Sequence, residues 1–243
     1  MLWVRMEGGS SWLDLRVSVA RQREAVDVDT RLFINERSAR IKLVMPCGAR
    51  QAEYEVPGGH VTRGAQGEVP GGRWVRTAKL GFASNGLYNF DLKDGVLRAT
   101  LARASRYACD LTLPADAQPW IAAVDAGELR FKFNLCPGDG NLPLLARQLE
   151  EPLVSLAVAP SAGDLPRQGS LLQLQPATMR ILSLRDDGGN GLLLVAQDMN
   201  GQTVTPHLKW MGKILKLDKV PDGQIAAWRL MQVDGQWVAN RMK

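Results

Sequence analysis

GFASNGLYNFDLKDGVLRATLARASRYACD, residues 81–110, is the stretch that decides the fold class. Asp94-Gly95 lies near its centre, and these two residues tolerate the positive φ angles that a two-residue hairpin turn requires. With Lys93 opposite Val96, one face becomes apolar, pairing Leu92 with Leu97, Phe90 with Ala99 and Tyr88 with Leu101. The other face is polar and solvated, pairing Asp91 with Arg98 and Asn89 with Thr100. A one-residue shift would expose the apolar set, so turn and pattern predict the same antiparallel hairpin.

Alternation of apolar and polar residues continues along most of the chain. Residues 26–34 (VDVDTRLFI) and 40–45 (RIKLVM) are typical of half-buried strands. Further turn pairs separate apolar runs at Gly58-Gly59, Gly71-Gly72, Asp187-Gly188, Asn200-Gly201 and Asp234-Gly235. Many short strands separated by turns predict an all-β sandwich or barrel.

One helix and one domain boundary interrupt this pattern. Residues 141–152 (NLPLLARQLEEP) offer a capping Asn141, an early proline and a leucine repeat that Pro152 ends, so a short connecting helix is expected. Residues 159–170 (APSAGDLPRQGS) are rich in Pro, Gly and Ser and lack apolar periodicity. We therefore predict two domains, residues 1–158 and residues 159–243.

Composition describes an ordinary soluble globular protein. The 243 residues are 45% hydrophobic and 23% charged, with a formal net charge of +5. Lysine and arginine are scattered, so nucleic-acid binding is not expected. No apolar run is long enough for a secretory signal or a membrane span, which indicates the cytoplasm. Residues 207–220 space Lys209, Lys213 and Lys216 so that they could share a helix face; a solvated face of a packed element is favoured over a membrane-surface helix.

Residue types that carry catalysis or bind metals are scarce. Cys47, Cys109 and Cys136 are odd in number and widely spaced, which indicates free thiols rather than disulfides or a zinc site. The two histidines, His60 and His207, have no metal-ligand spacing, and no nucleophile or phosphate-binding motif is present. Asp27 and Asp29 share one strand face, which fits a solvated surface better than a catalytic pair. No metal and no cofactor is therefore predicted.

Three segments together resemble the C-terminal β region of glycoside hydrolase family thirty-eight α-mannosidases. In residues 56–76 the matching positions are Gly59, Arg63, Glu68, Pro70 and Trp74. In the opening stretch they are Asn85, Tyr88, Asp91, Val96, Leu97, Arg98, Leu101, Arg103 and Tyr107. In residues 125–140 they are Asp125, Gly127, Phe133, Leu135 and Pro137, whereas Leu129 and Gly138 stand where the family has histidines. Segments near residues 150, 170 and 181–201 follow the same order, so the resemblance covers about residues 26–208.

The resemblance implies a fold but provides no catalytic centre. It implies a large antiparallel β-supersandwich of the galactose-mutarotase-like kind, followed by a smaller C-terminal β module. In the family, the zinc ion, its ligands and the nucleophilic aspartate belong to an N-terminal domain that has no counterpart here. Retaining hydrolysis needs two carboxylates about 5–5.5 Å apart, and no motif of this sequence matches either one.

Two classes of function remain open. One is a non-catalytic accessory or scaffold part of an α-mannosidase-like glycoside hydrolase, with a glycan or a separate catalytic domain as its partner. The other is a self-sufficient carbohydrate-binding or aldose-epimerase-like protein on the same fold. The epimerase needs a proton donor and a base converging on a sugar, for which His60, His207 and Glu128 are the candidates.

The sugar-contacting candidates come from the opening stretch. Arg103 matches an arginine that lies near the catalytic cleft in the family, and Asn85, Tyr88 and Tyr107 are its companions. Arginine and asparagine make paired hydrogen bonds to hydroxyls, and tyrosine offers a flat apolar face with a polar tip. If Asn85 begins the first strand of the hairpin and Arg103 ends the second, both lie at the end opposite the Asp94-Gly95 turn.

Overall fold

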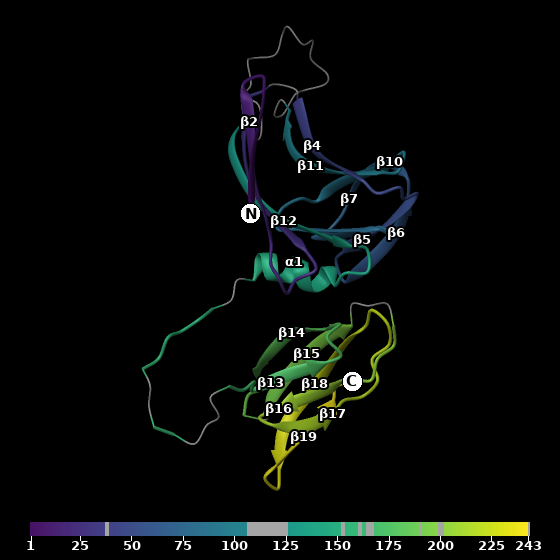
Figure 1. Ribbon diagram of the computed structural model, residues 1–243. Coiled ribbons are helices and arrows are strands. Elements are labelled where there is room, and N and C mark those ends of the chain that lie inside the picture. The colour runs from purple at the N-terminus through teal and green to yellow at the C-terminus, as the bar shows by residue number, and fades with distance from the viewer. Residues whose placement is uncertain are drawn as a thin grey trace, which may run out of the picture. The chain divides into compact units, whose positions relative to one another are not determined.

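The chain forms two compact units rich in β-structure. The structure is a computed structural model that describes residues 1–36, 39–105, 126–151, 154–159, 162–163, 168–189, 191–198 and 202–242. Within these ranges it has nineteen strands and one α-helix, which confirms the predicted all-β class. The units are Met1–Val154, coloured purple to teal in Figure 1, and Ser155–Lys243, coloured green to yellow. The boundary expected from composition, after residue 158, lies a few residues further along.

An eight-stranded antiparallel sheet forms the base of the first unit. In spatial order its strands are β1 (Leu2–Gly8), β2 (Ser11–Val19), β3 (Val26–Ile34), β12 (Gly127–Pro137), β9 (Leu80–Ser84), β8 (Trp74–Arg76), β5 (Gln51–Val56) and β6 (Gly59–Gly64). The alternation read in residues 26–34 is present, because Val28, Leu32 and Ile34 of β3 are buried while Arg31 is exposed. This alternation gives the sheet an apolar inner face and a polar outer face.

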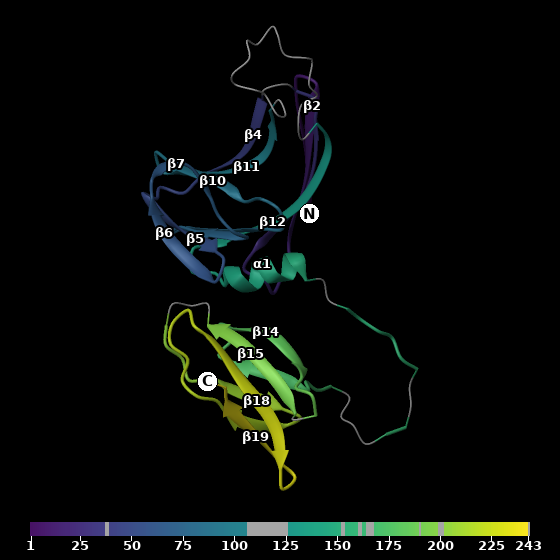
Figure 2. The same ribbon diagram turned by 180° about the vertical axis from the view of Figure 1, so that it is seen from behind.

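A four-stranded antiparallel sheet packs on the inner face. Its spatial order is β4 (Ala39–Pro46), β11 (Val96–Ala104), β10 (Asn89–Lys93) and β7 (Gln66–Pro70), and Figure 2 shows the two layers from behind. Buried side chains from both sheets share one core, in which the ring of Phe82 lies 5.8 Å from Phe90 and 5.6 Å from Phe133. The first unit is therefore an antiparallel two-sheet sandwich, as predicted.

The predicted hairpin is confirmed at its turn. Asp94 and Gly95 have φ angles of 54° and 73°, the two positive values of a type I′ turn. Strands β10 and β11 pair Lys93 with Val96, Leu92 with Leu97, Asp91 with Arg98 and Phe90 with Ala99. Phe90, Leu92, Leu97 and Ala99 are buried, so the apolar face packs into the core.

The hairpin departs from prediction away from its turn. Strand β10 begins at Asn89, and Tyr88 before it is half exposed rather than packed beside Phe90. The pairing of β11 with β4 shifts between Thr100 and Ala102, and this irregularity breaks the two-residue alternation. The polar face is less solvated than expected, because Asp91 is buried and bonds both Arg98, at 3.0 Å, and Lys42.

Helix α1 (Leu142–Glu150) packs on the outer face of the large sheet and confirms the predicted connector. The side chain of Asn141 caps it by accepting a hydrogen bond from the Leu144 N–H at 3.2 Å. Leu142, Leu145 and Ala146 are buried against a separate small core that includes Ala25, Trp74, Ala83 and Cys136. The helix contacts β8, β9 and β12.

The second unit has two small antiparallel sheets around its own core. One contains β13 (Leu172–Gln175), β16 (His207–Trp210) and β17 (Lys213–Lys216); the other contains β14 (Met179–Asp186), β15 (Leu192–Asp198), β18 (Ile225–Val233) and β19 (Gln236–Arg241). Trp228, Leu194, Leu208 and Leu230 are fully buried in that core. The hairpin at Asp234-Gly235 joins β18 to β19 as predicted, whereas Asn200-Gly201 lies outside the described residues.

The lysine-rich segment 207–220 is a hairpin rather than a helix. Met211 and Gly212, with φ angles of 47° and 84°, turn the chain between β16 and β17. Lys209, Lys213 and Lys216 are exposed there, as expected for a solvated face. The helix that their spacing suggested does not form, because the segment is a hairpin. Among the described residues, no helix has the length and apolar character needed to cross a membrane.

Candidate binding groove

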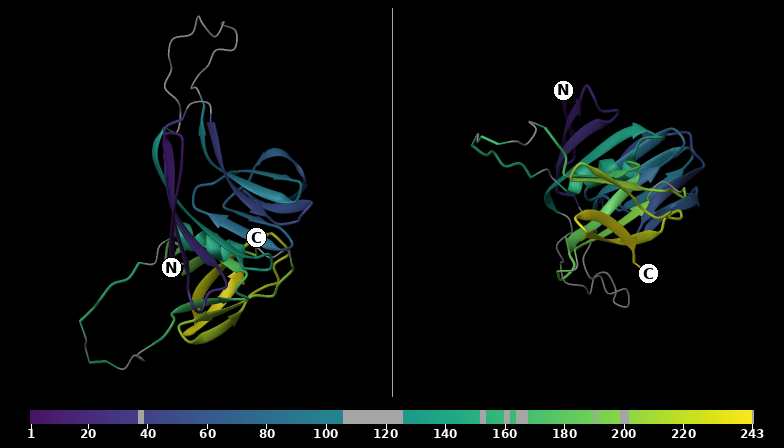
Figure 3. Two further views of the ribbon diagram at one scale, coloured as in Figure 1. Left: turned by 45° about the horizontal axis from the view of Figure 1, so that its top comes forward. Right: turned by 90° about the horizontal axis from the view of Figure 1, so that it is seen from below.

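The outer face of the eight-stranded sheet carries a charged groove. Helix α1 occupies the part of this face over β8, β9 and the end of β12, while Figure 3 shows β1–β3 and β12 running together along one side of the unit. The groove has a volume of about 470 Å³. It is lined by Trp3, Asp14, Arg16, Asp29, Thr30, Arg31, Asn85, Arg130, Phe131 and Lys132, and we call it the outer-face groove.

One row of side chains crosses this groove from strand to strand. The sheet register places Trp3 opposite Arg16, Arg16 opposite Asp29 and Asp29 opposite Lys132. Asn85, just after β9, bonds Lys132 and extends the row to a fifth strand. At about 4.8 Å between strands, the row spans roughly 19 Å. The row is therefore long enough to contact an extended ligand rather than a single small ring.

Asn85 is held by the backbone of β12. Its N–H donates to the Lys132 carbonyl at 3.2 Å, and its Oδ1 accepts from the Lys132 N–H at 2.8 Å. This second bond identifies Oδ1 as the acceptor, which leaves the exposed Nδ2 group to donate outward. The arrangement presents a fixed amide donor at one end of the groove.

The other end of the groove offers an aromatic ring and a cation. Trp3 is 73% exposed on the edge strand β1, so its flat apolar face is available to a ligand. Arg16, its cross-strand partner, is also exposed. The Nε of Arg16 donates to the Met1 Sδ at 3.0 Å, and Arg16 forms no ion pair with a carboxylate of the described residues.

A second row braces the groove. Asp14 accepts from Arg5 through both carboxylate oxygens, at 2.7 and 2.9 Å, and this hydrogen bonding lowers the pKa of Asp14. The guanidinium groups of Arg5 and Arg31 lie 4.6 and 5.1 Å from the centre of the Trp12 ring. Trp12 in turn stacks on Phe33 at 5.8 Å. These contacts fix the side chains beside the groove.

Glu128 is tied to two arginines of the same face. It accepts from Arg31 at 2.5 Å and from Arg130 at 2.7 Å. Hydrogen bonding from Arg31, then from Arg130, lowers the pKa of Glu128 to about 2. At neutral pH this carboxylate is ionised and has no proton to donate, so it does not fit the role of a general acid.

Within the first unit, two of the epimerase candidates, His60 and Glu128, lie far apart on the large sheet. His60 lies on β6, at the opposite edge of the sheet from β1, with β5, β8 and β9 between it and the strand of Glu128. Its ring lies 6.0 Å from Trp74. His207 belongs to the second unit. Within the described ranges, no group of three or more His, Cys, Asp or Glu residues could hold a metal ion.

Of the three predicted sugar contacts that the structure describes, Asn85 alone lines the groove. Contrary to expectation it does not begin the hairpin: it follows β9 of the large sheet, whereas Arg103 is exposed on β11 of the small sheet, opposite Arg40. Tyr88 is half exposed in the segment before β10. Tyr107 lies outside the described residues.

Trp3 and Arg16 were missed by sequence reasoning, although a signal for their placement exists. Residues 2–8 and 11–19 form a hairpin around residues 9 and 10, with Trp3 and Arg16 on one face. That alternation predicts two strands with an outward Trp-Arg pair. The neighbours from β3, β12 and β9 come from distant segments, and nothing local predicts them.

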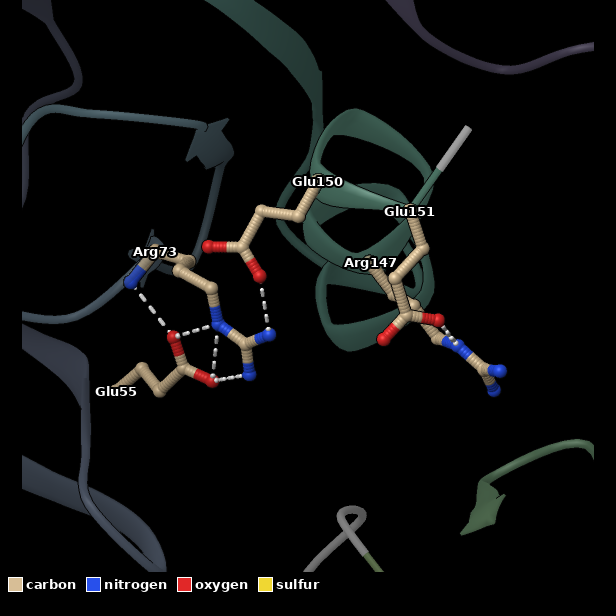
Figure 4. Close-up of polar contacts among 5 residues, drawn as sticks. All are labelled: Glu55, Arg73, Arg147, Glu150 and Glu151. Atoms are coloured by element: carbon tan, nitrogen blue, oxygen red, sulfur yellow. Dashed lines mark hydrogen bonds and ion pairs between the residues drawn. The ribbon is translucent and has the colours of Figure 1, made fainter. Parts of the chain in front are cut away.

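A second polar cluster, around Arg73, has a structural character. Arg73 lies between Glu55 of β5 and Glu150 of α1, and it bonds both (Figure 4). The Arg73 N–H also donates to Glu55 at 2.6 Å. Hydrogen bonding of the Arg73 guanidinium to Glu55 is the main cause that raises the pKa of Arg73. Because every member is paired, this cluster ties the helix to the sheet and offers no open position for a ligand.

The fold is similar to part of two solved structures. One is the crystal structure of an alpha-mannosidase from Enterococcus faecalis V583, and the other is a protein in glycosyl hydrolase family 38 from Enterococcus faecalis. Each aligns with 90% of this chain, with a TM-score of 0.72 and 16% sequence identity. The chain spans only 29% and 30% of those two proteins. No protein-family model and no curated protein matches the sequence.

The resemblance read from the sequence is therefore confirmed at the level of the fold. An identity of 16% is too low to carry over a substrate or a catalytic role. Support for a function must therefore come from how this chain's own residues are arranged.

Proposed function

We propose that this chain is a non-catalytic β region of an α-mannosidase-like glycoside hydrolase, and that it holds carbohydrate for a catalytic domain. The observation that carries the proposal is the fold match, which covers 90% of this chain but only 29–30% of each larger protein. The supersandwich of the galactose-mutarotase-like kind is the architecture we propose for the first unit.

The outer-face groove supports a carbohydrate-holding role. An exposed Trp3 ring can stack on the apolar face of a sugar, and the Asn85 amide can donate to a hydroxyl. Sugar binding at such sites uses a few positioned polar groups beside an aromatic surface. The sheet fixes the backbone position of both groups, and a hydrogen bond to the Lys132 N–H also holds the Asn85 side chain, which lowers the ordering cost when a ligand binds.

Titration of the chain with mannotriose, followed by amide and indole N–H signals in NMR spectra, tests this role. We expect shifts at the Trp3 indole and the Asn85 amide, and weaker binding by Trp3→Ala and Asn85→Ala. Arg103→Ala and Tyr88→Ala serve as controls for the alternative location on the small sheet. If only those two variants lose binding while their melting temperatures are unchanged, the site lies there and not in the groove.

The second part of the proposal is the absence of turnover. We expect the isolated chain to hold no tightly bound zinc and to leave aryl α-mannosides intact. The chain has two histidines, neither in a metal-ligand spacing, whereas the usual catalytic zinc shell combines several imidazole and carboxylate ligands. Metal analysis and a release assay for the aryl group measure this. One zinc per chain, or turnover that a chelator abolishes, would contradict it.

A further inference from the structure

We propose that the outer-face groove is selective for a sugar that carries an anionic group, a carboxylate or a phosphate, over a neutral sugar. This inference rests on the proposed function, because it names the class of carbohydrate that the same groove takes. It adds a charge preference that α-mannoside chemistry alone does not require.

The groove has more cations than carboxylates. Its lining contains Arg16, Arg31, Arg130 and Lys132 against Asp14 and Asp29. Adding the adjoining Arg5 and Glu128, which bond these residues, gives five cations against three carboxylates. Glu7 is the next carboxylate on β1, but it lies four residues from Trp3 and therefore roughly 13 Å along the strand. Asp27, two residues from Asp29 on the same face of β3, is paired with Arg23 at 2.8 Å and leaves this excess unchanged.

Half of this excess lies at Arg16, and the other half lies at Arg31 and Arg130, which share one carboxylate. Arg5 is neutralised by Asp14, Lys132 lies 3.4 Å from Asp29, and Arg31 and Arg130 share Glu128. Arg16 faces Asp29 across the strands but forms no ion pair with it. A guanidinium whose donors are not used by a carboxylate can bind one through two parallel hydrogen bonds.

The position of Arg16 beside Trp3 defines the kind of ligand. The two residues are direct cross-strand partners, whose Cβ atoms are about 4.5–5.5 Å apart. A ring stacked on Trp3 therefore brings a substituent within reach of the guanidinium. A simple anion would use Arg16 without Trp3, and a neutral sugar would use Trp3 without satisfying the charge of Arg16.

The order of charges along the row argues against a long polyanion. Asp29 stands between Arg16 and Lys132, so a chain with negative groups at every unit would meet a carboxylate in the middle of the groove. A ligand with one anionic group near Arg16 and hydroxyls near Asp29 and Asn85 avoids that repulsion. Carboxylate oxygens accept hydrogen bonds from hydroxyls, which gives Asp29 a role in such a complex.

The test compares three probes on the full chain: neutral mannotriose, a mannotriose in which one terminal unit is replaced by mannuronate, and mannose 6-phosphate. Calorimetric or NMR titration gives the dissociation constants. We expect at least one acidic probe to bind about tenfold or more tighter than mannotriose, because a charge-assisted hydrogen bond is stronger than a neutral one. Raising the salt from about 0.01 M to about 0.15 M should weaken only the acidic probes. The two acidic probes show whether carboxylate or phosphate is preferred.

Arg16→Gln is the decisive variant, and Arg50→Gln is its matched control. Both side chains are exposed and both changes remove one positive charge, but Arg50 lies outside the groove, between β4 and β5. We expect Arg16→Gln to weaken the acidic probe about tenfold and to change mannotriose binding by less than about twofold. Arg50→Gln should change neither. Trp3→Ala should weaken every probe.

The outcomes separate the two proposals. If acidic and neutral probes bind equally, or if Arg16→Gln and Arg50→Gln behave alike, the charge preference is overturned and the carbohydrate-holding role stands. If no probe binds, the charge preference is overturned and the carbohydrate-holding role fails with it. Loss of the acid preference in Arg16→Gln alone supports both.

Discussion

Arg73 shows at the level of one residue how the helix and the sheet are joined. Its side chain is 16% exposed and bonds Glu55, which is 7% exposed, and Glu150 of α1 at 2.9 Å (Figure 4). We expect Arg73→Met to lower the free energy of unfolding by about 2–4 kcal/mol, because it leaves the Glu55 carboxylate buried without a cation. Urea unfolding followed by circular dichroism measures the change.

Arg147 provides the matched control for Arg73. It forms an ion pair with Glu151 one helical turn away, and both side chains are substantially exposed. Arg147→Met should cost less than about 0.5 kcal/mol, because solvent screens an exposed pair. Equal losses of unfolding free energy in Arg73→Met and Arg147→Met would show that the buried ion pairs of Arg73 stabilise the fold no more than an exposed pair does.

Glu128 makes the stability of the first unit depend on pH in the acidic range. Its pKa is lowered from 4.5 to about 2 by Arg31 and Arg130, so its contribution is fully present above about pH 4.5 and is lost as the pH falls toward 2. We expect Glu128→Gln to lower the melting temperature at pH 7 and to approach the wild-type value near pH 2. Melting temperatures measured across that range test this. A difference that stays constant with pH would mean that the pKa of Glu128 is not lowered.

The candidate site could be predicted only in part from single residues. Asn85 was selected because it matches a position of the resembling family and because an asparagine can make paired hydrogen bonds to hydroxyls, and it lines the groove. Trp3 and Arg16 were not, because their meaning depends on the partners that the sheet brings beside them. The expectation that Tyr88 packs beside Phe90 was wrong, because β10 begins at Asn89.

Among the elements, the hairpin of β10 and β11 was the most predictable. The Asp94-Gly95 turn fixes its register over four residue pairs, all of which are found. Beyond them, the shift near Thr100 depends on pairing with β4, which the local sequence does not encode. Likewise, the turn between β16 and β17 uses Met211 at positive φ, a residue type that gives no turn signal, so the lysine spacing suggested a helix.

Gly95 is the residue on which this hairpin depends. Its φ is 73°, and a Cβ added there would lie 3.1 Å from the Gly48 Cα. We expect Gly95→Ala to destabilise the first unit by about 1–2 kcal/mol, because a side chain at positive φ is strained and the backbone of Gly48 cannot easily move. Thermal or urea unfolding measures the loss.

Gly8 offers the control for that substitution. It lies on β1 at a negative φ, and an added Cβ would meet no atom within 4 Å. Gly8→Ala should change stability by less than about 0.5 kcal/mol. A loss as large as that of Gly95→Ala would mean that the turn conformation is not the cause.

At the scale of the whole molecule, each unit has its own core. At the start of the second unit, before its first strand, Leu156 and Val158 are 84% and 77% exposed in a segment without regular structure. We expect brief digestion with thermolysin, which cleaves before large apolar residues, to cut at residues 154–159 first. Both fragments should keep the circular dichroism of β-structure.

A double variant sharpens the digestion experiment. Leu156→Asp with Val158→Asp removes the preferred cleavage positions and should slow the first cut without lowering the melting temperature, because neither side chain is buried. Mass spectrometry locates the cut. First cleavage within β3 or β18, or loss of β-structure from one fragment, would contradict the division into two independently stable units.

The fold as a whole was predictable from the sequence, but the groove was not. Alternation and turn residues act over a few positions, and they suffice to predict an all-β chain. The outer-face groove joins residues 3, 16, 29, 85 and 132 in one row, and this placement depends on strand order. Strand order is set by packing over the whole unit.

The division of the large sheet into an apolar inner face and a polar outer face determines how far the sequence of such a fold can vary. Every second residue of β1–β3 points away from the core. Substitutions at these positions change the outer surface and leave the packing inside the sandwich unchanged. A TM-score of 0.72 at 16% identity is what this freedom permits. A sheet of this kind can therefore accept many changes at alternate surface positions and still keep its fold.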